Sequence, residues 1–140
     1  MKKWFIISLL LLLTACSSKA WTESETFMTN DVTMIGIENK LGFEYDTTLP
    51  IKAGKTNKYL FHFWGQKDEL LGKLEVVATH QESGKTIHVF SSQNVDELQP
   101  LNGADHHLPV LMTLPDSGMW KIEVMFDTVL FDAIYVNVQP

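Results

Sequence analysis

The chain has 140 residues, with 17 acidic side chains against 11 lysines and no arginine, which gives a formal net charge of −6. This length accommodates one typical domain. Because arginine is the usual residue for phosphate recognition and for stacking on bases, an acidic chain without it argues against nucleic-acid binding and against electrostatic docking on anionic lipid.

The first 16 residues predict export and lipidation. Met1-Lys2-Lys3 is basic, residues 4–13 are apolar, and Leu13-Thr14-Ala15-Cys16 closes the segment. This order is typical of a secretory signal, and the apolar run is too short for a helix that crosses a hydrocarbon layer of about 30 Å. Leu-Thr-Ala-Cys resembles the lipobox of bacterial lipoproteins. That resemblance implies a signal peptide over residues 1–15 and a diacylglycerol and acyl lipid on Cys16.

Lipidation also explains the cysteine usage. Cys16 is the only cysteine, so an intramolecular disulfide is impossible. Two acyl chains suffice for stable anchoring, whereas one chain gives only marginal binding. The sequence therefore predicts a protein anchored at the extracytoplasmic face of the cell membrane. Without Lys2 and Lys3 the exported part keeps nine lysines against 17 acids, a net charge of −8.

The segment after the anchor is predicted to be a tether. Residues 16–30 are polar with isolated large apolar side chains, and we expect order to begin where Phe27 or Met28 meets the domain. The acidic residues are spread along the rest of the chain, which indicates a solvated surface. Residues 31–140 are predicted to form one domain.

That domain is predicted to consist of strands. Residues 119–126 are the clearest case, because Trp120 and Ile122 alternate with Lys121 and Glu123. Short strands separated by turn signals, such as Ser83-Gly84 and residues 115–118, indicate an immunoglobulin-like antiparallel β-sandwich of about seven strands. Residues 57–64 are aromatic on both faces, as in a central strand. The expected strands are 32–37, 41–46, 57–64, 70–80, 86–91, 108–114 with 119–126 as a hairpin, and 130–138.

A loop that ends in two histidines is the candidate metal site. Asp105, His106 and His107 could supply ligands to copper or zinc, and Met112 could add a thioether for copper. However, adjacent residues of an extended strand point to opposite faces, so the two histidines converge only if the chain bends. The favoured alternative is that Asn102 and Asp105 bond the loop backbone and the histidines cap a strand.

His62 shares a face with Trp64 on the aromatic strand and is predicted to be a buried or semi-buried histidine with satisfied hydrogen bonds, and not a metal ligand. Exposed aromatics are the other candidate site. Trp64, Trp21 and Phe90 could form an apolar interaction surface, or they could simply close the ends and faces of the sandwich.

Enzymatic activity is not predicted. The chain has no Gly-x-Ser-x-Gly elbow, no Ser-x-x-Lys motif and no phosphate-binding loop, and its one cysteine is assigned to lipid.

Several fragments together resemble a family of small, uncharacterised lipoproteins of Gram-positive spore-forming bacteria. The resemblance covers most of residues 32–138 and the lipobox, and its strongest fragments are residues 53–59, 61–65, 71–73, 102–109 and 114–121. It implies an immunoglobulin-like domain anchored to the outer leaflet of the cell membrane, and it implies no activity.

Two hypotheses follow for the function. The first is a lipid-anchored binding module without enzymatic activity, which meets an envelope protein or ligand of unknown identity through Trp64 or Phe90. The second is a copper- or zinc-binding lipoprotein that uses His106, His107, Asp105 and Met112. The first is favoured, because the motif Asp-His-His alone is a weak indication of a metal site.

Overall fold

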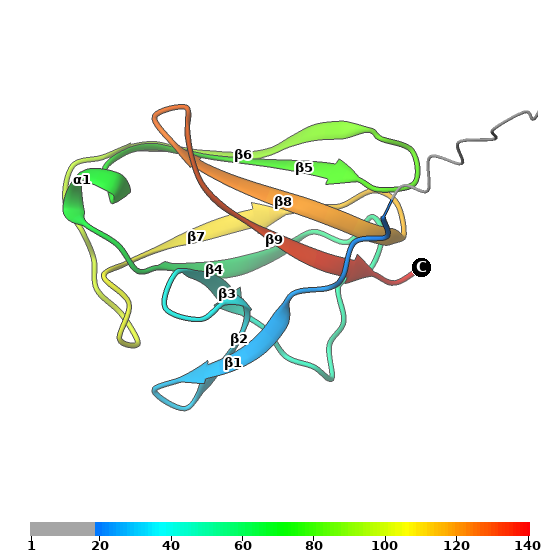
Figure 1. Ribbon diagram of the computed structural model, residues 1–140, viewed down its shortest axis with the longest axis horizontal. Coiled ribbons are helices and arrows are strands. Elements are labelled where there is room, and N and C mark those ends of the chain that lie inside the picture. Colours follow the sequence, from blue (N-terminus) through cyan, green and yellow to red (C-terminus); the bar gives the residue numbers. More distant parts are fainter. Residues whose placement is uncertain (1–18) are drawn as a thin grey trace, which may run out of the picture.

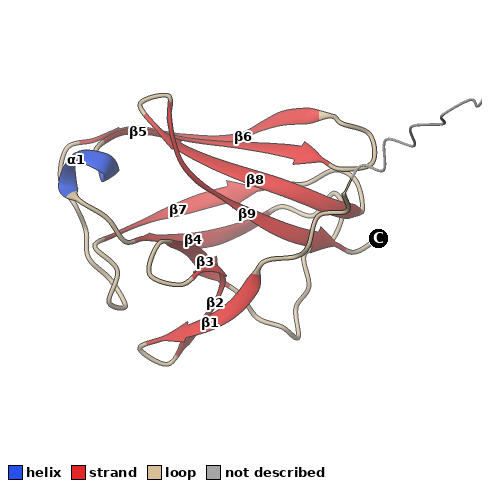
Figure 2. Ribbon diagram, in the orientation of Figure 1, coloured by secondary structure: helices blue, strands red, loops and turns tan. Residues whose placement is uncertain are grey.

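The computed structural model describes residues 19–140, which form two β-sheets and one short helix (Figure 1, Figure 2). The predicted signal peptide, residues 1–15, and the lipidation site Cys16 lie outside the described residues. No helix within residues 19–140 has the length and hydrophobicity needed to cross a membrane. In chain order the elements are β1 (Glu25–Thr29), β2 (Val32–Ile37), β3 (Leu41–Glu44), β4 (Asn57–Phe63), α1 (Lys67–Leu70), β5 (Gly72–His80), β6 (Thr86–Val95), β7 (His106–Met112), β8 (Gly118–Phe126) and β9 (Val129–Val138).

The strands are arranged as a sandwich of two sheets. The five-stranded sheet has the order β1-β2-β3-β4-β7, and the four-stranded sheet has the order β6-β5-β8-β9. Every neighbouring pair of strands is antiparallel. The predicted all-β class and antiparallel β-sandwich are therefore confirmed, with nine strands in the described residues where about seven were expected.

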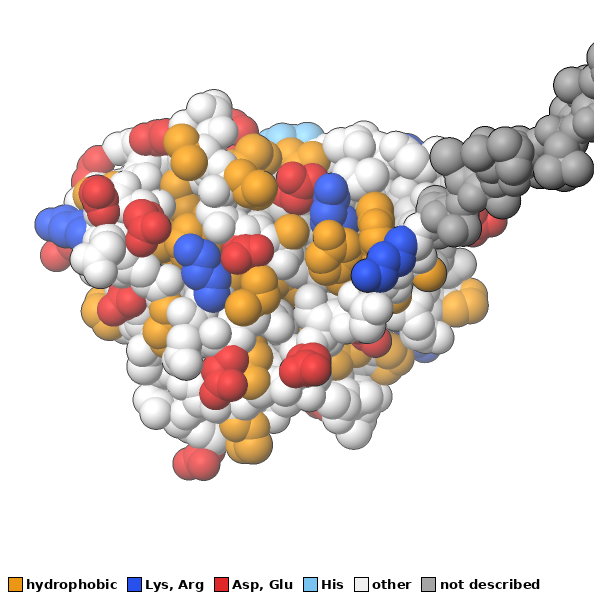
Figure 3. Space-filling model, in the orientation of Figure 1, with side chains coloured by type: hydrophobic (Ala, Val, Ile, Leu, Met, Phe, Trp, Pro, Cys, Tyr) orange, Lys and Arg blue, Asp and Glu red, His pale blue; other side chains and the backbone are white. Residues whose placement is uncertain are grey.

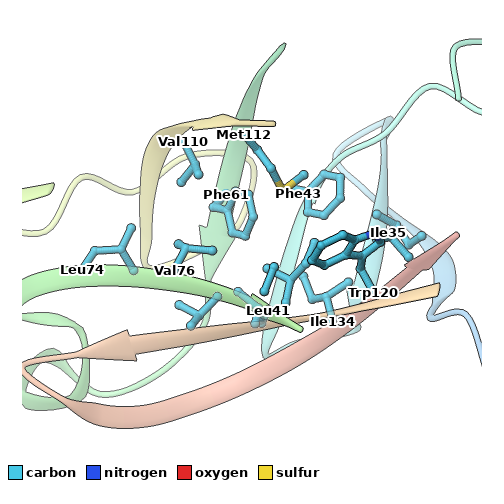
Figure 4. Packing of buried hydrophobic residues seen from close by; sticks show 14 of the residues in the cluster. Ile35, Leu41, Phe43, Phe61, Leu74, Val76, Val110, Met112, Trp120 and Ile134 are labelled. Carbon is cyan, nitrogen blue, oxygen red and sulfur yellow. The ribbon is translucent and has the colours of Figure 1, made fainter. Parts of the chain in front are cut away.

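The core lies between the two sheets and is rich in aromatic side chains. Phe43 and Phe61 of the five-stranded sheet stack with ring centroids 5.0 Å apart. Figure 4 shows Trp120 and Val76 of the four-stranded sheet facing these rings across the sandwich. Each buried aromatic removes about 150–250 Å² from water, so packing of this kind holds the two sheets together without a disulfide.

Strand alternation follows the predicted pattern in the four-stranded sheet. Leu74, Val76 and Ala78 are buried in β5, while Lys73 before them is exposed and Glu75 and Val77 between them are half-buried. The turn at Ser83-Gly84 joins β5 to β6 as a hairpin, and Gly84 adopts a positive φ of 70° that favours glycine.

Four predicted strands have boundaries that shift by two residues or more. The strand expected over 108–114 is His106–Met112. The strand expected over 41–46 ends at Glu44, and the one expected over 86–91 continues to Val95. The strand expected over 70–80 begins at Gly72, because Lys67–Leu70 forms α1. A capping box between Gln66 and Glu69 stabilises that single turn of helix.

The predicted hairpin of 108–114 with 119–126 is wrong. β7 pairs with β4 in one sheet, whereas β8 pairs with β5 and β9 in the other. The connection between them crosses the sandwich and is held by Trp120, whose indole N–H donates to the Asp116 carbonyl at 2.8 Å, and by His80, whose Nε2 donates to the Ser117 carbonyl at 2.8 Å. The Pro-Asp-Ser-Gly sequence correctly indicates a chain reversal, but it does not determine which sheet receives the next strand.

The predicted tether over 16–30 ends earlier than expected. Glu25–Thr29 forms β1 and pairs with β2 over its whole length, so the boundary placed at residue 31 is too late. Just before β1, the Ser24 amide donates to the Tyr135 carbonyl of β9 at 2.8 Å. These residues are polar in sequence, and backbone hydrogen bonds to both sheets, which do not depend on side-chain type, place them in the domain.

Candidate functional site

The outer face of the five-stranded sheet, on the side away from the core, carries the candidate site. Alternation along β4 places Phe61 and Phe63 in the core and therefore directs His62 and Trp64 to this outer face. Residues 96–105, which we call the covering loop, cross this face between β6 and β7. The Trp64 indole N–H donates to the Gly103 carbonyl at 2.9 Å, which joins the covering loop to the end of β4.

The tip of the covering loop is a two-residue turn. Leu101 and Ala104 form an isolated bridge, and between them Asn102 and Gly103 adopt positive φ values of 51° and 81°. Asn-Gly is the strongest short signal for a turn of this kind, because both central residues must have positive φ. The tip is also attached to β1, because the Thr29 hydroxyl donates to the Asn102 carbonyl at 2.8 Å.

The Asn102 side chain closes a polar cluster under the covering loop. Its amide nitrogen donates to Nε2 of His62 at 3.2 Å and lies 3.4 Å from the Glu44 carboxylate. Nδ1 of His62 donates to the Leu60 carbonyl at 3.0 Å, so the imidazole is in its neutral form with the proton on Nδ1. His62 is fully buried, which confirms the prediction of a buried, hydrogen-bonded histidine.

Burial lowers the pKa of His62 below its ordinary value, and the neighbouring His107, whose ring centroid is 6.2 Å away, lowers it further. The Leu60 carbonyl and the Glu44 carboxylate act in the opposite direction, and burial is the largest effect. His62 therefore stays neutral at pH 7 and accepts the hydrogen bond from Asn102.

The two adjacent histidines hold the other half of the covering loop. The Gln99 amide donates to Nδ1 of His106 at 2.9 Å, and Nδ1 of His107 donates to the Gln99 carbonyl at 2.6 Å. The two rings lie on opposite faces of β7: His106 packs on Phe63 in the interior, and His107 lies beside His62 outside. Together they bind both backbone polar groups of one residue, Gln99.

His106 is 1% exposed, and within residues 19–140 its buried Nε2 has no hydrogen-bond partner. Burial is the largest effect on the pKa of His106 and lowers it, and the nearby His107 adds to the shift. Protonation of His106 would remove the acceptor of the Gln99 amide and place an unpaired positive charge in the interior. The covering loop therefore depends on a neutral His106.

The predicted metal ligands do not converge. His106 and His107 point to opposite faces, and Met112 is 1% exposed in the core between the sheets. The Asp105 carboxylate accepts a hydrogen bond from the Gly65 amide at 2.9 Å, which fastens the covering loop to the β4–α1 connection. Within the described residues no three His, Cys, Asp or Glu side chains are grouped closely enough to hold a metal ion.

The predicted aromatic surface is also divided. Trp64 is half-buried against Phe27 on the outer face, and Trp21 packs on Tyr135 of the other sheet. Phe90 was expected on an outer face, but it packs against the core. An extra residue in β6, where Val76 and Val77 pair with Phe90 and His88, shifts the alternation and turns Phe90 inward.

A large depression, which we call the outer groove, adjoins the polar cluster. It has a volume of about 1350 Å³ and lies between the β3–β4 connection and the outer side of β4 and β7. Its lining combines acidic, basic and aromatic side chains with prolines and His107. The lining residues include Asp31, Glu44, Tyr45, Asp46, Leu49, Lys52, Lys55, Lys58, Tyr59 and His107.

The charged groups of the outer groove differ in their existing contacts. Asp46 accepts hydrogen bonds from the amide and the hydroxyl of Thr48, at 2.8 and 2.7 Å, and these bonds lower its pKa. Glu44 interacts with Asn102 and lies 4.0 Å from His62. In contrast, no ion pair of the described residues involves a lysine of the groove; the lysines that pair with acids are Lys73 and Lys121.

Two serine–histidine pairs lie outside this site. Ser83 is 2.9 Å from Nδ1 of His80, and Ser91 is 2.8 Å from Nε2 of His88. The other nitrogen of His80 donates to the Ser117 carbonyl and not to a carboxylate. Within residues 19–140 neither pair has the acidic partner that orients a catalytic histidine, so these pairs stabilise turns and strands.

Comparison with known proteins identifies one family and one solved structure of similar fold. Residues 12–136 match a family described as a domain of unknown function (DUF4871). The X-ray crystal structure of a "putative lipoprotein" from Bacillus anthracis is similar in fold, with a TM-score of 0.66 and 23% sequence identity over 86% of this chain and 87% of that chain. A search of the curated proteins gave no match.

Proposed function

The chain belongs to the DUF4871 family, whose function is unknown, and on that premise we propose that it is a lipid-anchored binding module without enzymatic activity at the extracytoplasmic face of the cell membrane. The lipobox-like Leu13-Thr14-Ala15-Cys16 supports the anchor. The structural neighbour from Bacillus anthracis, which is named as a lipoprotein, supports it as well.

The observation that carries the binding role is the outer groove. A depression of about 1350 Å³ exceeds the 300–1,000 Å³ of typical small-ligand pockets, so a ligand of more than drug size fits better. The wall of the groove includes Leu49, which is 72% exposed and has no role in the core. The face next to it is held in place by the covering loop, so the groove is presented on a rigid sheet.

The first experiment tests the anchor. The native chain and a Cys16→Ala variant are expressed with a C-terminal tag, and membrane and soluble fractions are compared. We expect the native protein in the membrane fraction, released only by detergent, and the variant outside it, because two acyl chains provide stable anchoring. Equal partition of the two proteins would contradict the proposal.

The second experiment tests the groove. A photo-reactive amino acid is placed at Leu49, in the groove wall, or at Val129, which is 69% exposed in the other sheet. The two positions are matched in exposure, so differences report location. We expect discrete cross-linked products on intact cells from position 49 and none from position 129. The same products from both positions, or none from either, would contradict a role for the groove.

A further inference from the structure

Three lysines are gathered in the outer groove. Lys52, Lys55 and Lys58 are spaced three residues apart and all line it, which is one third of the nine lysines in the described residues. No ion pair within residues 19–140 neutralises them. Three acidic residues, Asp31, Glu44 and Asp46, line the groove as well, and Glu44 and Asp46 accept hydrogen bonds from neutral groups. We call the part of the groove formed by residues 52–58 its basic end, because its ammonium groups are available for a ligand.

This basic end lies at the end of the molecule where the described chain begins. Lys52 bridges Gln139 next to the C-terminus, and the adjacent Val138 pairs with Gly118. The Gln81 amide donates to the Met119 carbonyl at 2.9 Å, and its side chain reaches the Lys19 carbonyl at 3.4 Å. Figure 1 shows the C-terminus and the start of the described chain together at this end.

The distance to the anchor is short. Lys19 is three residues after Cys16, and three residues span at most about 11 Å even when fully extended. A lipidated Cys16 therefore holds this end of the domain at the membrane surface. On the face drawn in Figure 3, lysine side chains lie near the start of the described chain and also at the far end, and acidic side chains are scattered over the whole face.

We propose that Lys52, Lys55 and Lys58 bind the phosphate groups of anionic lipids in the membrane that carries the anchor. This assignment deepens the proposed function and rests on it, because the short tether supplies the proximity. An ammonium group binds phosphate as a point charge, and lysines near an anionic leaflet are attracted to it. The net charge of −8 would repel the domain as a whole, so the lysines determine which side faces the membrane.

The test uses the chain from Cys16 to Pro140, coupled through its only thiol to maleimide lipid in vesicles. One set of vesicles is pure phosphatidylcholine, and the other contains equal parts of phosphatidylcholine and phosphatidylglycerol. Acetylation of each lysine by an amine reagent is followed by mass spectrometry. We expect acetylation of Lys52, Lys55 and Lys58 to be at least about threefold slower on the anionic vesicles, and the difference to vanish at high salt.

Three lysines at the opposite end serve as internal controls. Lys67 lies in α1, Lys73 contacts the β8–β9 turn through its backbone, and Lys40 lies over the Phe131 ring. Their acetylation is expected to be equal on both vesicles. In a Lys52→Gln/Lys55→Gln/Lys58→Gln variant, Lys85 in the β5–β6 turn is expected to be acetylated equally on both vesicles, because the orientation is lost.

Results of two kinds would overturn the assignment. One is equal acetylation of the groove lysines on both vesicles, or equal protection of Lys67. The other is the same protection by inorganic phosphate or glycerol phosphate without vesicles, which would make the ligand a soluble phosphate. Since the anchor is supplied chemically, either failure leaves the fractionation result for Cys16→Ala, and with it the proposed anchoring, unaffected.

Discussion

The two sides of β4 bury their side chains by different means. Phe61 and His62 are neighbours in sequence, and both are fully buried. Phe61 is covered by the opposite sheet through apolar packing, whereas His62 is covered by Asn102 and the covering loop through hydrogen bonds to a neutral imidazole. Equal burial therefore does not mean equal dependence on pH. The apolar packing around Phe61 should be insensitive to pH, whereas the covering of His62 should open when its polar contacts are lost.

The largest expected loss of stability follows from a change on the core-facing side of β4. Phe61→Ala should lower the free energy of unfolding by about 3–5 kcal/mol, because it removes a buried ring from an aromatic cluster and leaves a cavity. Urea denaturation measures the loss. Hydrogen exchange in the covering loop should change only with global stability, and selective opening of that loop would contradict the separation of the two sides.

A smaller effect is expected from the covering loop. Asn102→Gly should cost about 1–3 kcal/mol, because the buried His62 Nε2 loses its hydrogen-bond donor. Asn102→Ala should cost about 1 kcal/mol more, since position 102 has a φ of 51° that alanine tolerates poorly. Urea midpoints measure both losses. If the two variants were equally stable, the turn conformation would contribute nothing, and if neither lost stability, the polar cluster would not matter.

The pH dependence sharpens the contrast. The pKa values of His62 and His106 are lowered in the fold, so the unfolded chain binds more protons below the ordinary histidine pKa of about 6.5. Stability should be complete above that pH and should fall as the pH drops below it, by at most about 1.4 kcal/mol per pH unit for each histidine.

Two variants locate the source of this pH dependence. Phe61→Ala should lower the whole stability curve without changing its slope, because it leaves the hydrogen bonds of His62 and His106 in place. Asn102→Gly should flatten the slope, because His62 then meets water in the folded state. Unfolding curves between about pH 7 and pH 5 measure both. A native slope of zero, or the same slope in all three proteins, would refute the assignment to the covering loop.

The smallest effect is expected when Cu²⁺ or Zn²⁺ is added to the protein. Titration of residues 17–140 with Cu²⁺ and Zn²⁺ should show no stoichiometric binding, and His106→Ala/His107→Ala should not change the titration, because the two rings point to opposite faces of β7. Isothermal titration calorimetry measures the binding of each metal. One-to-one binding that the double variant loses would show that the β7 strand bends to bring the histidines together.

Local sequence patterns predicted much of the fold. Alternation in β5 and β8 identified their buried faces, and Ser83-Gly84 identified a hairpin. The errors concern pairing over long distances. The partner of β7 is β4, some 50 residues earlier in the chain, and no local pattern specifies that choice. β1 was missed because its side chains do not alternate clearly and backbone pairing with β2 determines it.

The candidate site was predicted in part. The sequence singled out residues 102–109 and predicted a buried His62, and the structure shows that Asn102 links the two. The roles of Glu44 and Gln99 were missed, because their contacts join strands and loops that are distant in sequence. The Asn-Gly turn was the one local signal for the tip of the covering loop.

The amino-acid sequence by itself determined the composition-driven properties of the protein: a lipobox-like leader, a single cysteine, an acidic balance and strand periodicity. These depend only on residue types and their local order. The tertiary structure alone decided that two adjacent histidines hold the backbone N–H and carbonyl of Gln99 from opposite faces of β7, and that three lysines without an ion-pair partner in the described residues share the outer groove. Net charge is a sum along the chain, but the direction in which charge is presented depends on which distant strands pair.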